Sequence, residues 1–337
     1  MSIRVLTAGP LTTVQDLGRA GHAAEGYRCC GAADPYAARL ANLLVGNDPG
    51  AAVLETTVQG PQLQFTHAAV FALTGAEAPA VLDGKPVPFY APLYAQTGSV
   101  LAVGAAQEGL RSYLAVWGGL AVPPVQGSRS TDLACRLGGL EGRALKAGDL
   151  LPLTERGGLA ALWWKKTRSL RADRPLEDAA ARRGHRLWRW TGGRQIPLLR
   201  AVPGPQWQAF TPAGQQAFTH GVYRLTSDCS RMACKLQGPA IETAAGADIL
   251  SDGIVSGSVQ VSGSGQPMVM LADHQSTGGY AKIATVIGAD LPALAQLRPG
   301  QEVAFTLTDP ASAVAAARAQ AACLQQVRAR LDPIRKE

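Results

Sequence analysis

Residues 265–290 read GQPMVMLADHQSTGGYAKIATVIGAD. The part before Asp273 is apolar at nearly every position, which is typical of a strand buried on both faces. An acid, an imidazole, an amide, a hydroxyl and two adjacent glycines follow before the sequence turns apolar again at Ala281. Buried polar groups need hydrogen-bond partners, so this set predicts a cleft or a polar neighbour at the end of the strand.

The same strand pattern recurs along most of the chain. Short runs of Val, Leu, Phe and Tyr that end at Gly or Pro, such as AVFALTG (69–75) and RSYLAVWGGL (111–120), are typical of β-strands. The stretches KAGDLLPL (146–153) and RPGQEVAFTL (298–307) each place a Gly turn before a strand, as β-barrel corners often do. The chain is therefore predicted to be mostly β.

A few helices are expected beside these strands. The range 34–46 begins with Asp34 as N-cap and Pro35 at the first helical position, and it ends at Gly46. The range 309–333 repeats the Asp-Pro start and predicts the longest helix. ADLPALAQL (289–297) predicts one short helical turn.

A chain of 337 residues with 47% hydrophobic and 17% charged residues is long for one core, so two domains, or one with large elaborations, are expected. VLTAGPLTTVQ near Val5 is echoed by LRAVPGPQWQAFT near Val202, which suggests a diverged duplication. With 22 prolines, chance Gly-Pro pairs remain an alternative. We predict a β domain over 1–195, including a basic linker at 160–195, and a second over 196–337 that ends in the long helix.

The formal net charge of +7 comes from one segment. Residues 165–200 carry 11 Lys and Arg against 3 Asp and Glu, a local charge of +8, so the rest of the chain sums to −1. Basic segments bordered by aromatic residues can bind nucleic acid or anionic membranes, but Pro175 and Gly184 interrupt any continuous basic helix. We interpret the segment as a linker whose tryptophans dock on a neighbour, and we expect neither nucleic acid nor a membrane as partner. These tryptophans are Trp163, Trp164, Trp188 and Trp190.

Other features exclude several classes of function. No apolar run approaches the roughly 18 residues of a membrane span, and the N-terminus does not resemble a signal peptide, so a cytoplasmic location is expected. The six cysteines form no CxxC pair and have no histidine at zinc-ligand spacing, so no metal site is expected. Phosphate-loop, dinucleotide, HExxH and GxSxG motifs do not occur in the sequence.

Four stretches combine turns with polar residues. In three of them, taken singly, a turn, a helix face or an ordinary ion pair explains the polar residues better than a functional site does: TTVQDLGRAGH (12–22), CCGAADPYAARLAN (29–42) and SDCSRMACKLQGP (227–239). The fourth, SDGIVSGSVQVSGSGQP (251–267), leads directly into the strand before Asp273. After that strand, Gly278 and Gly279 let backbone N–H groups approach a ligand, which favours a functional cleft.

Together with GPLTTVQDLGR and LETTVQGPQLQF, these stretches resemble the biotin-dependent carboxyltransferase family, from Ile3 to about Thr306. That family includes the C subunit of bacterial 5-oxoprolinase, the second allophanate-hydrolase-like subunit and the carboxyltransferase region of urea amidolyase. The resemblance implies two related cyclophilin-like β-barrel domains and a separate B-like partner subunit. An A-like subunit that uses ATP is a further candidate partner. No cofactor would be bound stably here, and carboxybiotin, where used, would be presented by another protein.

The candidate catalytic residues are Asp273, as a base or substrate-orienting acid, and His274, because an imidazole titrates near neutral pH. Gly278 and Gly279 would stabilise a developing oxyanion through their N–H groups. The other candidates would bind the substrate or close the cleft: Asn42, Arg231, Lys235, Gln260, Gln275, Thr277, Tyr280 and Lys282. Compared with the family pattern, Cys30 replaces serine, and His274 and Lys235 replace arginine, whose planar guanidinium grips a carboxylate with two hydrogen bonds.

The function implied by the resemblance is that of a C-subunit-like component of an ATP-dependent 5-oxoprolinase. Together with separate A and B subunits it would hydrolyse 5-oxoproline to glutamate, and it would not be active alone. One alternative is a biotin-dependent carboxyltransferase that acts on a urea- or guanidine-like amide. The other is a non-catalytic regulatory binding protein, resembling the family's antagonist of a kinase inhibitor.

Overall fold

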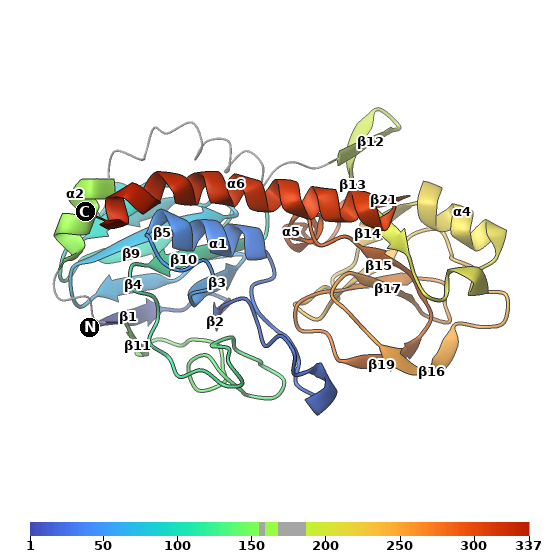
Figure 1. Cartoon of the computed structure of the whole chain (residues 1–337), viewed down its shortest axis with the longest axis horizontal. Coiled ribbons are helices and arrows are strands. Elements are labelled where there is room, and N and C mark those ends of the chain that lie inside the picture. The colour runs from blue at the N-terminus through green and yellow to red at the C-terminus, as the bar shows by residue number, and fades with distance from the viewer. Residues whose placement is uncertain (155–158, 168–186, 337) are drawn as a thin grey trace. The chain divides into compact units, whose positions relative to one another are not determined.

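The computed structural model describes residues 1–154, 159–167 and 187–336. The chain divides into two compact units (Figure 1). Unit 1 comprises Met1–Arg19, Cys30–Arg183 and Ala321–Glu337, and unit 2 comprises Ala20–Cys29 and Gly184–Gln320. The division predicted at residue 195 stays a prediction. Within the described residues, no helix is both long and apolar enough to cross a membrane.

Unit 1 contains two antiparallel sheets. One has the strand order β11-β1-β4-β9-β6-β7 and the other β2-β3-β10-β5-β8. Alternate residues of both sheets meet in one apolar core, where the rings of Phe65 and Phe71 lie 5.2 Å apart. The strands are β1 (Ser2–Thr7), β2 (Leu11–Gln15), β3 (Val53–Thr57), β4 (Gln62–Phe65), β5 (Ala69–Gly75), β6 (Ala80–Leu82), β7 (Lys85–Pro86), β8 (Pro92–Ala95), β9 (Val100–Val103), β10 (Arg111–Val116) and β11 (Leu150–Pro152).

Helices cover the other face of the five-stranded sheet. The helix α1 (Pro35–Leu44) begins as predicted, since the Asp34 carboxylate accepts a hydrogen bond from the Ala37 N–H at 2.9 Å. Its apolar side forms a second core with β3, β5 and β10. The helix α2 (Ala160–Thr167) and the C-terminal part of α6 (Pro310–Lys336), through Leu324 and Val327, join this core.

The tryptophans of the basic segment divide into two kinds. Trp163 on α2 is buried, stacks on Trp117 with ring centroids 5.7 Å apart, and donates from Nε1 to the Val45 carbonyl at 3.0 Å. Trp164 is partly buried against the same core and stacks on Tyr94, with ring centroids 6.3 Å apart. Docking on a neighbour is therefore confirmed for Trp163 and Trp164. Trp188 and Trp190 are 42% and 69% exposed, so for them the prediction is wrong. Residues 168–186, the middle of the predicted linker, lie outside the described residues.

Unit 2 is a β-barrel. Its sheet has the order β12-β13-β20-β17-β18-β15-β14-β21, and a parallel pairing of β13 with β21 closes it. The interior is filled by a third apolar core, which includes Phe218 and Phe305. The strands are β12 (Leu187–Thr191), β13 (Arg194–Pro203), β14 (Val222–Leu225), β15 (Ala233–Gln237), β17 (Ser258–Val261), β18 (Pro267–Met270), β20 (Lys282–Val286) and β21 (Glu302–Leu307).

Short helices complete unit 2: η1 (Ala23–Glu25), η3 (Trp207–Ala209), α4 (Pro212–His220) and α5 (Leu291–Ala295). The predicted short turn corresponds to α5 and the predicted long helix to α6, so both are confirmed. The helix α4 was not predicted, although Thr211 caps it through a hydrogen bond from the Gly214 N–H at 3.0 Å. A mostly β fold with a barrel and few helices is confirmed.

A two-stranded ribbon lies on the outside of the barrel. It consists of β16 (Asp248–Gly253) and β19 (Thr277–Tyr280), which pair antiparallel. Ile254, directly after β16, packs on Ala233 and Met270, two residues that pair across β15 and β18. Because β19 leads directly into β20, this ribbon positions the polar stretch at 273–280.

Candidate functional site

The register of the barrel brings three predicted residues into one row. Lys235 on β15 pairs with Met268 on β18, Met268 pairs with Gln260 on β17, and Gln260 pairs with Lys282 on β20. Directly paired residues point to the same face of a sheet. The register of β17 and β20 shifts between Val259 and Gln260, so the common side of Gln260 and Lys282 follows from their contacts with the ribbon, at the Tyr280 carbonyl and at Asp252. Neighbours such as Val259 fill the barrel interior, so the row lies on the outer face, where the ribbon packs.

Lys282 is the most buried cation of this row, with a side chain 4% exposed. Its Nζ donates to Asp252 Oδ2 on the ribbon and to the Gly253 carbonyl at 2.8 Å, and its backbone N–H donates to Gln206 Oε1 at 3.1 Å. A buried ammonium is stable only when it is paired and hydrogen-bonded. Asp252 therefore neutralises Lys282 and fastens the ribbon to the barrel.

Gln260 and Gly278 fit closely beside this pair. Gln260 is 1% exposed and donates from Nε2 to the Tyr280 carbonyl at 3.3 Å. A Cβ on Gly278 would lie 2.6 Å from Ile254 Cδ1 and 2.8 Å from Gln260 Nε2. A side chain at Gly278 would therefore displace the ends of the Ile254 and Gln260 side chains, while the oxyanion role of Gly278 and Gly279 stays a prediction. We call Gln206, Asp252, Gly253, Gln260, Gly278 and Lys282 the Lys282 cluster.

Asp252 is the accessible acid of the Lys282 cluster, with a side chain 52% exposed. It also accepts hydrogen bonds from Gln206 Nε2 at 3.4 Å and from the Gly253 N–H at 2.7 Å. The hydrogen bond from Lys282, followed by that from Gly253, lowers the pKa of Asp252 below its ordinary value. An ionised carboxylate that is held in place and open to solvent can accept further hydrogen bonds from a ligand.

Asp273 is placed differently. It is buried, and its two carboxylate oxygens accept from Arg231 Nε at 2.9 Å and Arg231 Nη2 at 2.7 Å. Its backbone N–H also donates to the Arg231 carbonyl at 2.9 Å. This bidentate buried pair joins the end of β18 to the loop before β15, which supports a structural role for both residues.

The residues that follow Asp273 lead into the ribbon. His274 is buried, and its Nδ1 donates to the Gln275 carbonyl at 2.7 Å, which leaves Nε2 as the other ring nitrogen available to a partner. Gln275 is half-buried. Thr277 is exposed on β19 and pairs with Gly253 on β16.

Lys235 and Tyr280 line an open groove of about 890 Å³ in unit 2. Lys235 is half exposed and pairs with Asp228, with 3.3 Å between Nζ and Oδ2. The walls carry hydroxyl and amide side chains: Thr226, Ser227, Gln237, Ser262, Ser264 and Gln266. Asp252 and Lys282 are not among the residues that line it. Lys235 and Tyr280 therefore lie in the same groove, which is separate from the Lys282–Asp252 pair.

Asn42 lies in unit 1, where it holds the loop after α1. It is fully buried, its Nδ2 donates to the Ala51 carbonyl at 2.7 Å, and its Oδ1 accepts from Asn47 at 3.0 Å. These bonds support a structural role for Asn42.

The polar residues around Asp16 also form hydrogen bonds within unit 1. Its carboxylate accepts from the hydroxyls of Ser128 and Ser130, both at 2.6 Å, from the Gly18 N–H at 2.8 Å and from the Arg129 N–H. Arg19, 2% exposed, donates to the carbonyls of Ser130 and Val125. The polar residues of this stretch thus fasten one loop to another.

Sequence reasoning missed three members of the Lys282 cluster: Asp252, Gly253 and Gln206. Asp252 lies in the polar stretch 251–267, and an acid directly before a glycine was an available signal. Gln206 had no comparable signal, because its contact with Lys282 joins residues 76 positions apart. In the described part of the chain, no three His, Cys, Asp or Glu residues gather as a metal site would require.

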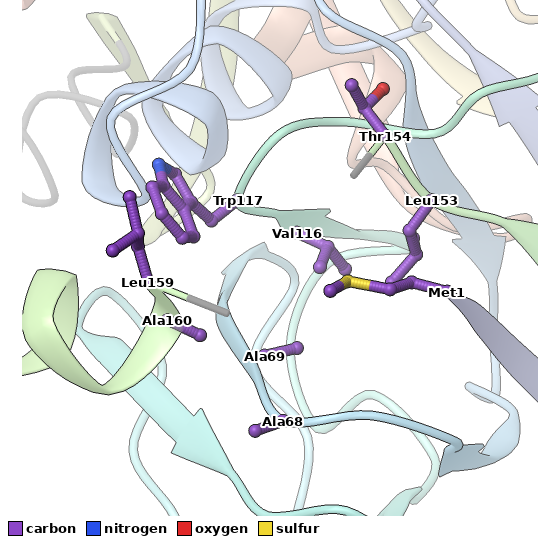
Figure 2. A pocket seen from close by; sticks show the side chains of 9 residues that line it. All are labelled: Met1, Ala68, Ala69, Val116, Trp117, Leu153, Thr154, Leu159 and Ala160. Atoms are coloured by element: carbon purple, nitrogen blue, oxygen red, sulfur yellow. The ribbon is translucent and has the colours of Figure 1, made fainter. Parts of the chain in front are cut away.

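A small pocket in unit 1 has no comparable chemistry. Figure 2 shows that apolar side chains, including those of Met1, Trp117 and Leu159, surround it, with Thr154 at its edge. Its volume of about 20 Å³ is close to that of one water molecule. The pocket is too small and too apolar to be the functional site.

Comparison with known proteins identifies the family to which the fold belongs. The family described as carboxyltransferase domain, subdomain A and B, matches residues 25–307. The chain is 40% identical to the 5-oxoprolinase C subunit of Escherichia coli, over 98% of both chains, and 36% identical to that of Haemophilus influenzae, over 98% of this chain and 99% of the relative. The Kluyveromyces lactis urea carboxylase structure superposes with a TM-score of 0.84 at 26% identity, over 97% of this chain and 29% of that chain. The chain belongs to the carboxyltransferase domain family.

Proposed function

We propose that the chain is the C subunit of an ATP-dependent 5-oxoprolinase, which opens the lactam ring of 5-oxoproline to give glutamate. The observation that carries this proposal is the 40% identity to a 5-oxoprolinase C subunit over 98% of both chains. The match extends over both units of the chain, which supports the proposal for the chain as a whole.

The Lys282 cluster supplies groups that suit a small planar amide. A lactam offers one N–H donor and one carbonyl acceptor, and the cluster offers a carboxylate, two amide side chains and a ribbon backbone rich in glycine. The chain's part in the reaction is to bind and orient the ring. ATP would be used by an A-like subunit, and a B-like subunit would complete the heteromer.

The test is co-expression of the chain with the products of neighbouring B-like and A-like genes. We expect the proteins to co-elute on size exclusion and to release glutamate from 5-oxoproline only with ATP. Omitting this chain should abolish the release. Separate elution at micromolar concentration, or glutamate release without this chain, would overturn the proposal.

Carboxyl transfer to a urea-like amide is the second candidate, because the urea carboxylase structure superposes on 97% of the chain. It requires carboxybiotin presented by another protein. In the same assay it predicts consumption of carboxybiotin in the presence of urea, with no glutamate formed. A stable complex without either activity would favour the regulatory alternative.

A further inference from the structure

Four acids lie in or near the polar stretch at 273–280, and they differ in the contacts of their carboxylates. Asp248 is exposed on β16, opposite Tyr280. Both oxygens of Asp273 are used by Arg231 inside the protein. Asp228 forms an exposed pair with Lys235. Asp252 combines an exposed carboxylate with a buried cation directly behind it, and each of its oxygens has two lone pairs.

We infer that Asp252, rather than Asp273, accepts the hydrogen bond from the N–H of the substrate amide, and that Lys282 is the positioning residue that holds it. The inference rests on the proposed function for the identity of the substrate. It extends that function by naming the ligand class, planar amides that carry an N–H beside their carbonyl, such as a lactam or a urea.

The geometry supports this division of roles. Lys282 Nζ is already committed to Asp252 and to the Gly253 carbonyl, and its burial keeps it away from a ligand on the surface. Asp252 Oδ1 accepts a bond from its neighbour Gly253, so its direction is fixed. Charge-assisted hydrogen bonds of this kind are roughly twice as strong as neutral ones, which gives a carboxylate an advantage over an amide in binding an N–H.

A purely structural role, in which the pair only fastens the ribbon, predicts different behaviour. In that case Asp252→Asn would lower stability and activity together, and the loss of kcat/KM would be equal for all substrates. A ligand contact predicts that the loss depends on the N–H of the substrate.

The experiment uses the co-expressed complex with 5-oxoproline and with N-methyl-5-oxoproline. Asp252→Asn should lower kcat/KM for 5-oxoproline by about 30-fold or more, as expected for loss of a hydrogen bond to a charged acceptor. It should leave turnover of the N-methyl compound within about threefold of its wild-type value. The matched control is Asp248→Asn on the same strand, which should change neither substrate. Equal loss on both substrates, or a loss below about threefold on 5-oxoproline, would overturn the inference.

Lys282→Met tests the positioning role by a pH profile. The hydrogen bond from Lys282 is the largest cause of the lowered pKa of Asp252, with the Gly253 N–H and Gln206 as the neutral contacts. In the Met variant that pKa should rise, so the acid limb of kcat/KM should move to higher pH. If the variant folds and the acid limb of its kcat/KM profile lies at the same pH as in the wild type, the positioning role of Lys282 is wrong.

A wild-type complex that releases no glutamate would instead refute the proposed function. The inference would then be judged by titrating the chain with imidazolidin-2-one, a cyclic urea, and following the amide NMR signals of Gly253 and Gly278. Shifts in the wild type that disappear in Asp252→Asn would support it. Identical shifts in both proteins, or none in the wild type, would overturn it.

Discussion

Asp16 and Asp252 look alike in the sequence and are used in opposite ways. Each lies one or two residues before a glycine, and each carboxylate accepts a hydrogen bond from that glycine's N–H. Asp16, 8% exposed, is surrounded by donors from residues 128–130 of unit 1. Asp252 has a side chain 52% exposed and one buried cation behind it. An acid shortly before a glycine thus indicates a carboxylate held by the glycine N–H, and the tertiary contacts decide whether it is buried or exposed.

The largest effect should come from Asp273, which resembles Asp16 in burial although it lies in unit 2 beside the ribbon. Asp273→Asn leaves the Arg231 guanidinium buried without its carboxylate, and breaking such a pair costs about 3–5 kcal/mol. Urea unfolding of the isolated chain measures it. A variant that keeps wild-type stability and loses only activity would show that Asp273 has a functional role rather than a structural one.

Asp16→Asn should destabilise unit 1 by about 2–3 kcal/mol, because hydrogen bonds to a charged acceptor are among the stronger ones and the new amide would face donors. The control is Asp48→Asn, at an exposed loop carboxylate that accepts from the Gly50 N–H at 2.8 Å. That change should stay within about 0.5 kcal/mol. Equal effects of the two substitutions on the urea midpoint would remove the distinction between interior and surface acids.

Gly46→Ala tests the helix layer of unit 1. A Cβ at this position would lie 2.1 Å from Trp163 Cζ2, and the backbone has φ +77. We expect a loss of about 2 kcal/mol from strain and displacement of the ring. Gly84→Ala is the matched control, with φ +78 and open space around its Cβ, and should lose about 1 kcal/mol. If both variants melt at the same temperature, the packing of Trp163 does not require the absence of a side chain at Gly46.

The smallest effect concerns pH. Hydrogen bonding from Arg143 lowers the pKa of Asp149 in the folded protein. A carboxylate with a depressed folded pKa contributes stability above its unfolded pKa of about 3.9, and loses it as the pH falls through the folded value. Because Arg143 is partly exposed, the contribution should stay below about 1 kcal/mol. Asp149→Asn should therefore lower the free energy of unfolding by up to that amount at pH 7, where the wild type has the full contribution. Urea unfolding at a series of pH values should show the two proteins converging below about pH 4.

Much of the fold could be predicted because its signals are local. The Asp-Pro starts of α1 and α6 and the Gly-bounded strands depend on a few adjacent residues. Gln260, Gly278 and Lys282, which were predicted to bind the substrate, lie together in the Lys282 cluster, and their part in binding stays a prediction. Their roles were harder to predict. Whether Asp273 faces a ligand depends on Arg231, 42 residues away, and whether Asp252 is buried depends on how the ribbon packs.

The parallel stack of Trp117 and Trp163, with an angle of 2° between the ring planes, has a spectroscopic consequence. Two indoles this close couple their electronic transitions, so unit 1 should give a paired circular-dichroism signal in the ultraviolet. Trp188 and Trp190 in unit 2 are exposed, and their emission should be red-shifted and readily quenched by acrylamide. The unfolding of unit 1 can thus be followed by the loss of this dichroism signal in an unlabelled sample, while the emission of Trp188 and Trp190, already exposed in the folded protein, should change little.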